Sequence, residues 1–168
     1  MNEHSVILIA HNIRSLWNIG SFFRTADAFG VSHIHLTGYT AAPPRYEITK
    51  TALGAQEWIP WSVDTDPMIV LEKRRSEGYE IVSLEITGHS TPLSAYRPLR
   101  PVCLIVGHEV LGVPPVLLEA SDRVVHIPMI GKKESLNVSV ALGIALYQLK
   151  ATSLPFLPSH LPLREEKV

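Results

Sequence analysis

Residues 123–151 read RVVHIPMIGKKESLNVSVALGIALYQLKA. This stretch predicts a short β-branched strand at 123–129, a polar loop, and a long apolar helix at 135–151. Ser135 is placed to cap the start of that helix, where a hydroxyl accepts a hydrogen bond from an unpaired N–H group. Asn137 then falls in the first turn of a helix that is apolar on nearly every side, where its amide needs a partner.

Runs of β-branched residues alternate with helical patterns through the rest of the chain. Strands are predicted at 5–11, 33–39, 79–86 and 102–108, with a brief extended piece at 58–61. Helices are predicted at 17–29, 48–56, 66–78 and 114–121. Continuous apolar strands separated by helices are typical of an α/β fold with a mostly parallel sheet and helices on both faces.

The length and the ends of the chain predict one domain and a tail. A chain of 168 residues buries a sizeable core without disulfides or a metal. We expect the domain to span residues 1–151. Residues 152–168 are rich in proline and then charged, which predicts an extended tail.

Charge and composition narrow the function classes. The net charge of −1 argues against a protein that coats nucleic acid without specificity, but not against a local basic patch. No signal peptide or apolar run of about 20 residues is visible, so we expect no membrane span. The lone Cys103, inside an apolar run, indicates a buried thiol and a reducing, cytoplasmic location.

Several well-known motifs are missing from the sequence. There is no G-x-G-x-x-G, no P-loop and no G-x-S-x-G, so nicotinamide, ATP and esterase chemistry lack support. The stretch GHEVLG has Gly112 where a zinc-binding H-E-x-x-H needs histidine. We therefore expect no metal site.

In open α/β sheets, ligands bind beyond the carboxyl ends of the strands. Four loops follow predicted strands in this way, and all are rich in Gly, Pro, Asn or charged residues. They are HNIRSLWNIG (11–20), TGYTAAPPRYEI (37–48), GHEVLG (107–112) and PMIGKKESLN (128–137). These loops are the candidate rim of a ligand site.

The helix at 17–29, WNIGSFFRTADAF, carries a polar stripe. Gly20, Arg24 and Ala28 lie four residues apart on one helical face, so another backbone or a ligand can come close to the guanidinium. A structural alternative to ligand binding by Arg24 is an ion pair between Arg24 and Asp27.

Two residues outside this helix also need an explanation. Glu109 can be explained without a ligand, as a solvated or helix-capping carboxylate. The single Gly143 in the last helix indicates close packing, since it costs about 1 kcal/mol relative to Ala.

Three of these stretches together resemble the SPOUT superfamily of knotted RNA methyltransferases, and specifically its SpoU branch. NIGSFFRTADAFGV (18–31) is similar to the first motif, Asn-x-Gly-x-x-x-Arg-[Ser/Thr]-Ala. LIVGHEVLGV (104–113) is similar to the second, an apolar strand followed by Gly-Asn-Glu-x-x-Gly. IPMIGKKESLNVSV (127–140) matches the third, Ile-Pro-Met-x-Gly with Ser-Leu-Asn-Val-Ser. The motifs occur in the family's order over about residues 5–150.

The resemblance implies a fold that general topology rules disfavour. Members pass the last helix through a loop and form a deep C-terminal trefoil knot, which is an exception to the rule against knots. They bind S-adenosylmethionine at the knot and act as homodimers whose active site is completed across the interface. A dimer would explain an apolar helix that contains Gly143.

The resemblance also implies the roles of individual residues. The catalytic residues would be Asn18, Arg24, Glu109, Ser135 and Asn137. The cofactor-binding residues would be Leu104, Val106, Gly107, Ile127, Met129, Gly131 and Leu136. His108 departs from the second motif, which usually has Asn there, and this leaves the detail of the RNA contact open.

The implied activity is S-adenosylmethionine-dependent methylation of the ribose 2′-hydroxyl in tRNA or rRNA. Arg24 is too basic to serve as a general base, so we expect its fork to hold the 2′-oxygen and a phosphate. We expect no extra N-terminal RNA-binding domain, which leaves target choice to Arg14, Arg45, Lys50, the tail or a partner. Two alternatives are a knotted methyltransferase acting on a base, and a knotted domain that binds RNA without catalysis.

Overall fold

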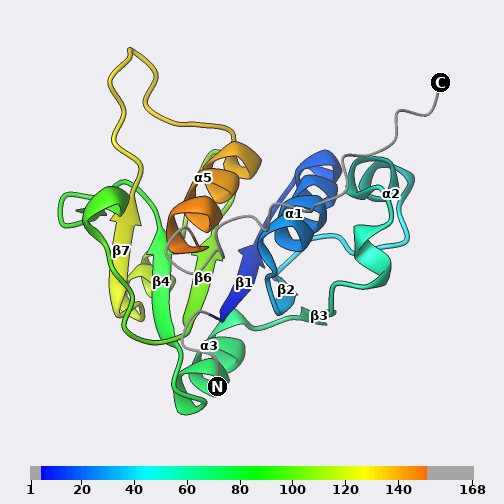
Figure 1. The fold of residues 1–168 in the computed structure, drawn as a ribbon, viewed down its shortest axis with the longest axis horizontal. Coiled ribbons are helices and arrows are strands. Elements are labelled where there is room, and N and C mark those ends of the chain that lie inside the picture. Colours follow the sequence, from blue (N-terminus) through cyan, green and yellow to red (C-terminus); the bar gives the residue numbers. More distant parts are fainter. Residues whose placement is uncertain (1–4, 151–168) are drawn as a thin grey trace, which may run out of the picture.

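Seven parallel strands form one sheet in the order β3-β2-β1-β6-β4-β7-β5 (Figure 1). The computed structural model describes residues 5–150. The strands are β1 (Val6–His11), β2 (His33–Thr37), β3 (Trp61–Asp64), β4 (Glu80–Leu84), β5 (Thr91–Pro92), β6 (Val102–Val106) and β7 (Arg123–His126). Every pairing between neighbouring strands is parallel, which confirms the predicted α/β class.

Helices cover both faces of the sheet. They are α1 (Leu16–Phe29), α2 (Tyr46–Ala52), α3 (Pro67–Ser76), α4 (Pro115–Glu119) and α5 (Val138–Lys150), with short 3₁₀ turns η1 (Ala55–Glu57) and η2 (Leu93–Ala95). Side chains of α1, α2 and α5 share one buried cluster, and those of α3 and α4 share another. Successive residues of β1 alternate between the clusters, with Leu8 in the first and Ile9 in the second. Burial on both faces explains the continuous apolar runs of the central strands.

The single cysteine lies in this core. Cys103 is fully buried in β6 and makes no disulfide. Burial raises the pKa of its thiol to about 12, so it is uncharged at neutral pH. This confirms the interpretation of Cys103 as a small buried hydrophobe.

Gly20 permits a close approach between α1 and α2. A Cβ atom at this position would lie 2.4 Å from the Ile48 carbonyl oxygen and 1.8 Å from the Thr51 hydroxyl. Gly143 in α5 is different, because a Cβ there would meet only Thr25, at 3.8 Å. Close packing therefore explains Gly20 within the chain but does not explain Gly143.

The last helix begins later than predicted. α5 starts at Val138 and not at residue 135, because Asn137 occupies the capping position. Its side-chain oxygen accepts from the Ser139 N–H at 2.8 Å, and its carbonyl accepts from the Ala141 N–H at 2.9 Å. The prediction that Ser135 caps this helix was wrong, since an asparagine two residues further on provides the same acceptor.

Other boundaries also moved. The helix predicted at 48–56 is divided into α2 and η1 by Leu53 and Gly54, both with positive φ. The extended piece predicted at 58–61 lies a few residues later, as β3. β5 was not predicted, because a two-residue strand that contains proline carries no periodic signal.

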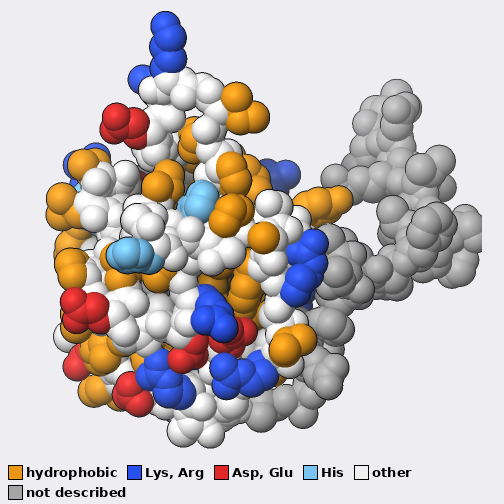
Figure 2. Space-filling view, turned by 90° about the vertical axis from the view of Figure 1, so that its left-hand side faces the viewer, with side chains coloured by type: hydrophobic (Ala, Val, Ile, Leu, Met, Phe, Trp, Pro, Cys, Tyr) orange, Lys and Arg blue, Asp and Glu red, His pale blue; other side chains and the backbone are white. Residues whose placement is uncertain are grey.

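The loop between β7 and α5 stands out from the body of the domain (Figure 1). Most of its residues are exposed, including Lys132 and Lys133, and Figure 2 shows basic side chains at its tip. Within residues 5–150, no helix is long and apolar enough to cross a membrane, and no group of acidic, histidine or cysteine side chains is arranged to hold a metal. The predicted tail lies outside the described residues.

Candidate active site

The Glu109 carboxylate joins the loop after β6 to the start of α1. It accepts hydrogen bonds from the backbone N–H groups of Arg14 and Ser15, at 3.0 and 2.9 Å, and from Asn18 Nδ2 at 3.0 Å. A carboxylate is stabilised at this end of a helix, where N–H groups lack helical partners. Glu109 therefore holds the segment that leads into α1, whose N-cap is Ser15, and does not cap the helix that follows it in sequence.

Asn18 also forms a hydrogen bond with Asn137, a residue of the third motif. Its Oδ1 accepts from Asn137 Nδ2 at 3.2 Å, while its Nδ2 donates to Glu109. The Asn18 side chain is buried, so both ends of the amide are satisfied within the protein. We refer to these three residues as the Glu109–Asn18–Asn137 chain, and it brings one residue of each sequence motif together.

The hydrogen bonds decide the charge of Glu109. Burial raises its pKa, but the Arg14 and Ser15 N–H groups and the Asn18 amide lower it by more, so the pKa lies below the usual value. Glu109 is therefore a carboxylate at neutral pH, with most of its acceptor capacity already used.

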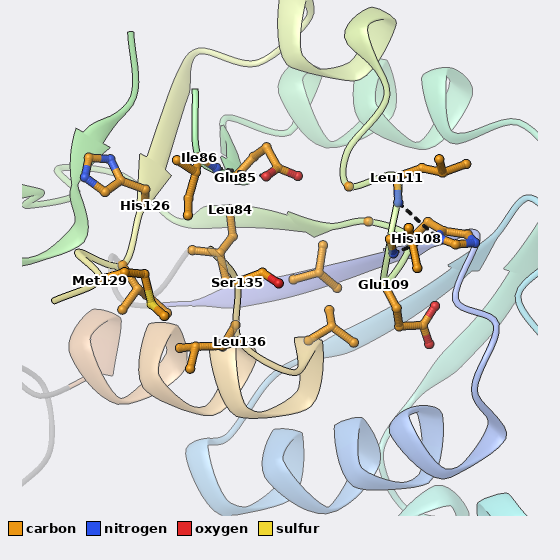
Figure 3. Close-up of a pocket in the computed structure, with 17 residues that line it drawn as sticks. Leu84, Glu85, Ile86, His108, Glu109, Leu111, His126, Met129, Ser135 and Leu136 are labelled. Carbon is orange, nitrogen blue, oxygen red and sulfur yellow. Dashed lines mark hydrogen bonds between the residues drawn. The ribbon is translucent and has the colours of Figure 1, made fainter. Parts of the chain in front are cut away.

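His108, where the second motif usually has Asn, stabilises the turn that follows it. Its Nδ1 accepts from the backbone N–H groups of Val110 and Leu111, at 2.9 and 3.1 Å, one of which is drawn in Figure 3. An Asn side-chain oxygen makes the same kind of local bond. Since Nδ1 accepts both bonds, Nε2 is the ring nitrogen left to donate a hydrogen bond. The difference at this position thus preserves the loop and adds an aromatic ring.

A cavity of about 210 Å³ lies beside this chain, at the carboxyl ends of β4, β6 and β7. Figure 3 shows Leu84, Ile86 and Met129 towards one end, together with His126, and shows His108, Glu109 and Leu111 at the other. The lining residues are Leu84, Glu85, Ile86, Val106, Gly107, His108, Glu109, Val110, Leu111, Gly112, His126, Ile127, Met129, Ser135, Leu136, Val138 and Ala141.

Five of the seven residues expected to bind a cofactor line this cavity. They are Val106, Gly107, Ile127, Met129 and Leu136. Leu104 does not, because it lies two residues inside β6 and is fully buried in the core. Gly131 is exposed in the loop between β7 and α5 and is also outside the lining.

Gly107 and Gly112 let the loop after β6 close on itself. A Cβ at Gly107 would lie 2.3 Å from the Gly112 carbonyl oxygen. The His108 and Gly112 backbones exchange two hydrogen bonds, at 3.1 and 2.9 Å. Gly112 has a φ of 69°, a left-handed conformation that favours glycine. This closed loop forms one wall of the cavity.

Glu85 is a lining residue that the sequence reasoning missed. Its Oε2 accepts from the Val113 N–H at 2.9 Å and fastens the loop after β6 to the end of β4. The strand was predicted to continue to residue 86, so Glu85 was placed inside it, whereas β4 ends at Leu84 and leaves Glu85 on the rim. No motif pointed to it.

The other two residues with an expected catalytic role do not join the chain. Ser135 lines the cavity but makes no hydrogen bond to Asn18 or Glu109. Arg24 is exposed and lies six residues after Asn18, about 240° further round the helix. The alternative ion pair with Asp27 is also not formed, since Asp27 accepts from Trp58 Nε1 at 2.7 Å. Among residues 5–150, Arg24 has no polar partner.

The expected RNA-binding residues lie on the same side as the first two rim loops. Arg14 is exposed beside Glu109, and Arg45 is exposed immediately before α2. The Lys50 ammonium lies 6.0 Å from the centre of the Trp17 ring and 5.4 Å from that of Tyr46. These cations are close to the start of α1 and not to the apolar end of the cavity.

Comparison with known proteins agrees with this geometry. The model of the SpoU rRNA Methylase family matches residues 5–147. A tRNA (guanosine(18)-2′-O)-methyltransferase of Aquifex aeolicus is 31% identical over 147 residues, which cover 87% of this chain and 69% of that protein. The 23S rRNA (guanosine-2′-O-)-methyltransferase RlmB of Nitrosomonas europaea is 32% identical over 148 residues, 88% of this chain and 56% of that protein.

Solved structures give the same result. The AdoMet-bound rRNA methyltransferase from Sinorhizobium meliloti superposes with a TM-score of 0.86 at 28% identity, over 92% of this chain and 59% of that one. The SpoU methyltransferase AviRb from Streptomyces viridochromogenes, in complex with AdoMet, gives 0.82 at 25% identity, over 91% and 62%. The chain thus spans only part of the length of its relatives. Three motifs joined at one site, and a family match over nearly all the described residues, show that the chain belongs to the SpoU rRNA methylase family.

Proposed function

We propose that this protein is an S-adenosylmethionine-dependent RNA methyltransferase that modifies the ribose 2′-hydroxyl of tRNA or rRNA. The observation that carries the proposal is the Glu109–Asn18–Asn137 chain, which lies directly beside the cavity. The names of the Aquifex and Nitrosomonas relatives support the reaction and the substrate class.

The cavity suits S-adenosylmethionine on chemical grounds. Its lining contains the carboxylates Glu85 and Glu109 but no Lys or Arg, which favours a ligand that carries a positive sulfonium. Leu84, Ile86 and Met129 offer an apolar surface for a flat ring, and the closed loop offers backbone polar groups. When bound, the cofactor supplies a methyl group that is already activated for transfer.

The residues of the chain would orient the reacting groups. Glu109 is a positioning residue, because its carboxylate is held by three donors and is poorly available as a base. It fixes the Asn18 amide, and Asn137 fixes the other end of that amide. Ser135, at the cavity wall, is free to contact the ribose. Arg24 would hold the 2′-oxygen and a phosphate and stabilise the developing alkoxide.

The position of Arg24 favours a homodimer in which it serves the partner's site. Arg24 makes no contact with the Glu109–Asn18–Asn137 chain of its own subunit and lies on a different face of α1. One face of α5 carries the exposed apolar residues Val140, Ile144 and Tyr147, with Gly143 between them. An exposed apolar stripe of this kind is typical of an interaction surface. A second subunit packed there would also account for Gly143.

RNA would enter along the exposed cations Arg14, Arg45 and Lys50, which attract phosphate groups. The trefoil knot and the cytoplasmic location remain predictions from the family resemblance and from the composition. The division into a catalytic domain at 1–151 and a tail at 152–168 likewise stays a prediction.

The test is methyl transfer with identification of the product. Purified protein, labelled S-adenosylmethionine, and unmodified tRNA or rRNA should give label in a 2′-O-methylated nucleoside after digestion. Asn18→Ala should abolish the transfer, while a surface control such as Ser94→Ala should not. Label in a methylated base would instead support a base methyltransferase. RNA binding without transfer, on an RNA that the protein recognises, would support the non-catalytic alternative.

A further inference from the structure

Tyr39 is an exposed aromatic residue on a rigid backbone. Its side chain is 59% exposed, and among residues 5–150 its hydroxyl has no hydrogen-bond partner. Its backbone N–H, however, donates to the Asn12 side-chain oxygen at 3.1 Å. The next residue, Thr40, is buried, and its hydroxyl bonds to the Ala10 carbonyl at 3.0 Å and to the Ile13 N–H at 2.9 Å. The segment that carries the ring is thus held on both sides.

Two left-handed residues build this arrangement. Asn12 has a φ of 55° and Gly38 a φ of 66°. For asparagine this conformation is tolerated but uncommon, so other contacts have to hold it. Asn12 Nδ2 donates to His11 Nε2 at 3.0 Å, and His11 Nδ1 in turn donates to the Thr37 hydroxyl at 3.0 Å. These hydrogen bonds hold Asn12 in place, and Asn12 in turn holds the backbone of Tyr39.

The Tyr39 ring lies next to the ring of His108. The centres of Tyr39 and His108 are 6.4 Å apart, and the planes meet at 78°. The Val110 and Leu111 N–H groups hold the His108 ring through Nδ1, so Nε2–H is left as a donor. His108 precedes Glu109, whose carboxylate binds the start of α1. The two rings therefore lie at the mouth of the proposed active site, on its β1 and β2 side.

We propose that Tyr39 and His108 form a subsite for an unpaired nucleobase of the substrate RNA. Unpaired bases are recognised by stacking on aromatic side chains, and each stack contributes about 1–3 kcal/mol. Because the backbone that carries Tyr39 is already held, less conformational freedom is lost when a base stacks on its ring. The side chain of Arg14, exposed at the same rim and without an ion pair within residues 5–150, is placed to bind the adjoining phosphate. This subsite rests on the proposed function, since it selects the base near the ribose to be modified.

The test separates base recognition from phosphate binding. The probes are a short, fluorescently labelled oligoadenylate and an oligomer of the same length and charge whose ribose units lack bases. Wild-type protein should bind the base-bearing oligomer about tenfold more tightly, because only that oligomer can stack. Tyr39→Leu, which keeps an apolar side chain but loses the ring, should bind both oligomers equally. Tyr39→Phe should keep the preference, since stacking does not use the hydroxyl.

Further measurements keep the outcomes distinct. S-adenosylmethionine binding should be equal in wild type and Tyr39→Leu, which shows that the variant is folded and its cofactor cavity intact. Absence of cofactor binding by the wild-type protein would contradict the proposed function. The difference in affinity between the base-bearing and base-free oligomers tests the subsite alone. Equal binding of both oligomers by the wild type, or a preference that survives Tyr39→Leu, would overturn the subsite. A change in subunit association in Tyr39→Leu would also overturn it, by assigning the ring to contact with a second copy.

Discussion

Asn18 Nδ2 lies 3.0 Å from Glu109 Oε1, although 91 residues separate the two in sequence. The contact fixes which way the buried amide faces, because the nitrogen must donate to the carboxylate. The amide oxygen is then left for Asn137, whose capping position at α5 ties the third motif to the first. The three motifs therefore form one hydrogen-bonded unit and not three separate binding loops.

Replacing the Asn18 amide with a carboxylate should disrupt this hydrogen-bonded unit. Asn18→Asp places a second carboxylate against Glu109 in a buried site, which should lower the free energy of unfolding by about 2 kcal/mol or more and abolish methyl transfer. Urea unfolding and the transfer assay measure both effects. The double variant Asn18→Asp with Glu109→Gln again pairs an amide with a carboxylate and should recover part of the lost stability. An Asn18→Asp protein as stable as the wild type would contradict the contact.

Two inactive variants should restore each other if Arg24 acts across a dimer. Arg24→Ala and Asn18→Ala should each be inactive alone. Mixed after reversible unfolding, they should give about a quarter of the wild-type rate, because half the dimers are mixed and each has one complete site. Arg24 acting within its own subunit would give no recovery. Mixing Asn18→Ala with Glu109→Ala should also give none, because both changes affect the same site.

Gly20→Ala should separate α1 from α2. The added Cβ would lie 2.4 Å from the Ile48 carbonyl oxygen, a backbone atom that moves only with its helix. We expect a loss of about 1–3 kcal/mol in the free energy of unfolding. Ser21→Ala, one residue further along the same helix, should change it by less than about 0.5 kcal/mol. Equal stability of the two variants would show that the helices are not in such close contact.

The protein should lose stability as the pH falls from about 6.5 towards 4. His33 and His35 lie side by side with ring centres 4.4 Å apart. His35 Nε2 accepts from Arg74, which requires a neutral ring with no proton on Nε2. Burial lowers the pKa of His33 to about 4, assisted by the charges of His35 and Arg74. Burial also lowers the pKa of His35, although Asp64 opposes this shift.

Stability falls with falling pH because the pKa values of His33 and His35 are lower in the folded protein than in the unfolded chain. The folded state favours neutral rings, so its stability is full above about pH 6.5 and declines as the rings are protonated. Asp64, Ser62, Arg74 and Lys73 are the other groups that face them. Urea unfolding at several pH values measures the slope, which His33→Gln should reduce. His89→Gln, at an exposed loop residue, should leave the slope unchanged, and a wild-type slope of zero would contradict the account.

Removing Glu85 should weaken cofactor binding without touching Asn18. Glu85→Ala frees the Val113 N–H and loosens the closed loop after β6, so we expect about a tenfold weaker affinity for S-adenosylmethionine. Calorimetry measures the change, and Glu119→Ala, on exposed α4, serves as the control. An unchanged affinity in Glu85→Ala would show that the loop holds its shape without this carboxylate.

The sequence predicted the order of strands and helices because buried parallel strands and capped helices leave periodic signals. α3 shows this best, since Asp66 caps its start and Pro67 follows as the first helical residue. The alternation of residues in a strand shows which face a side chain lies on, but not how close it lies to the end of the strand where the cavity begins. Leu104 and Val106 share a face of β6, but only Val106 reaches the edge where the cavity begins.

The connections between the predicted site residues could not be read from the sequence. The resemblance named Asn18, Glu109 and Asn137, yet a hydrogen bond between residues 91 or 119 positions apart depends on the whole topology. Local reasoning favoured Ser135 as the cap of α5 and missed that Asn137 both caps the helix and binds Asn18. Glu85 and Tyr39 were missed because neither belongs to a motif. Their importance comes from loops that only the fold brings to the same rim.

The cavity beside the Glu109–Asn18–Asn137 chain should bind S-adenosylmethionine. Calorimetric titration of the wild-type protein with this cofactor, and with its product S-adenosylhomocysteine, measures this binding. We expect about one site per subunit for both ligands, and loss of binding in Gly107→Ala, whose Cβ would lie 2.3 Å from the Gly112 carbonyl oxygen. If the folded wild-type protein bound neither ligand, the cavity would not be a cofactor site.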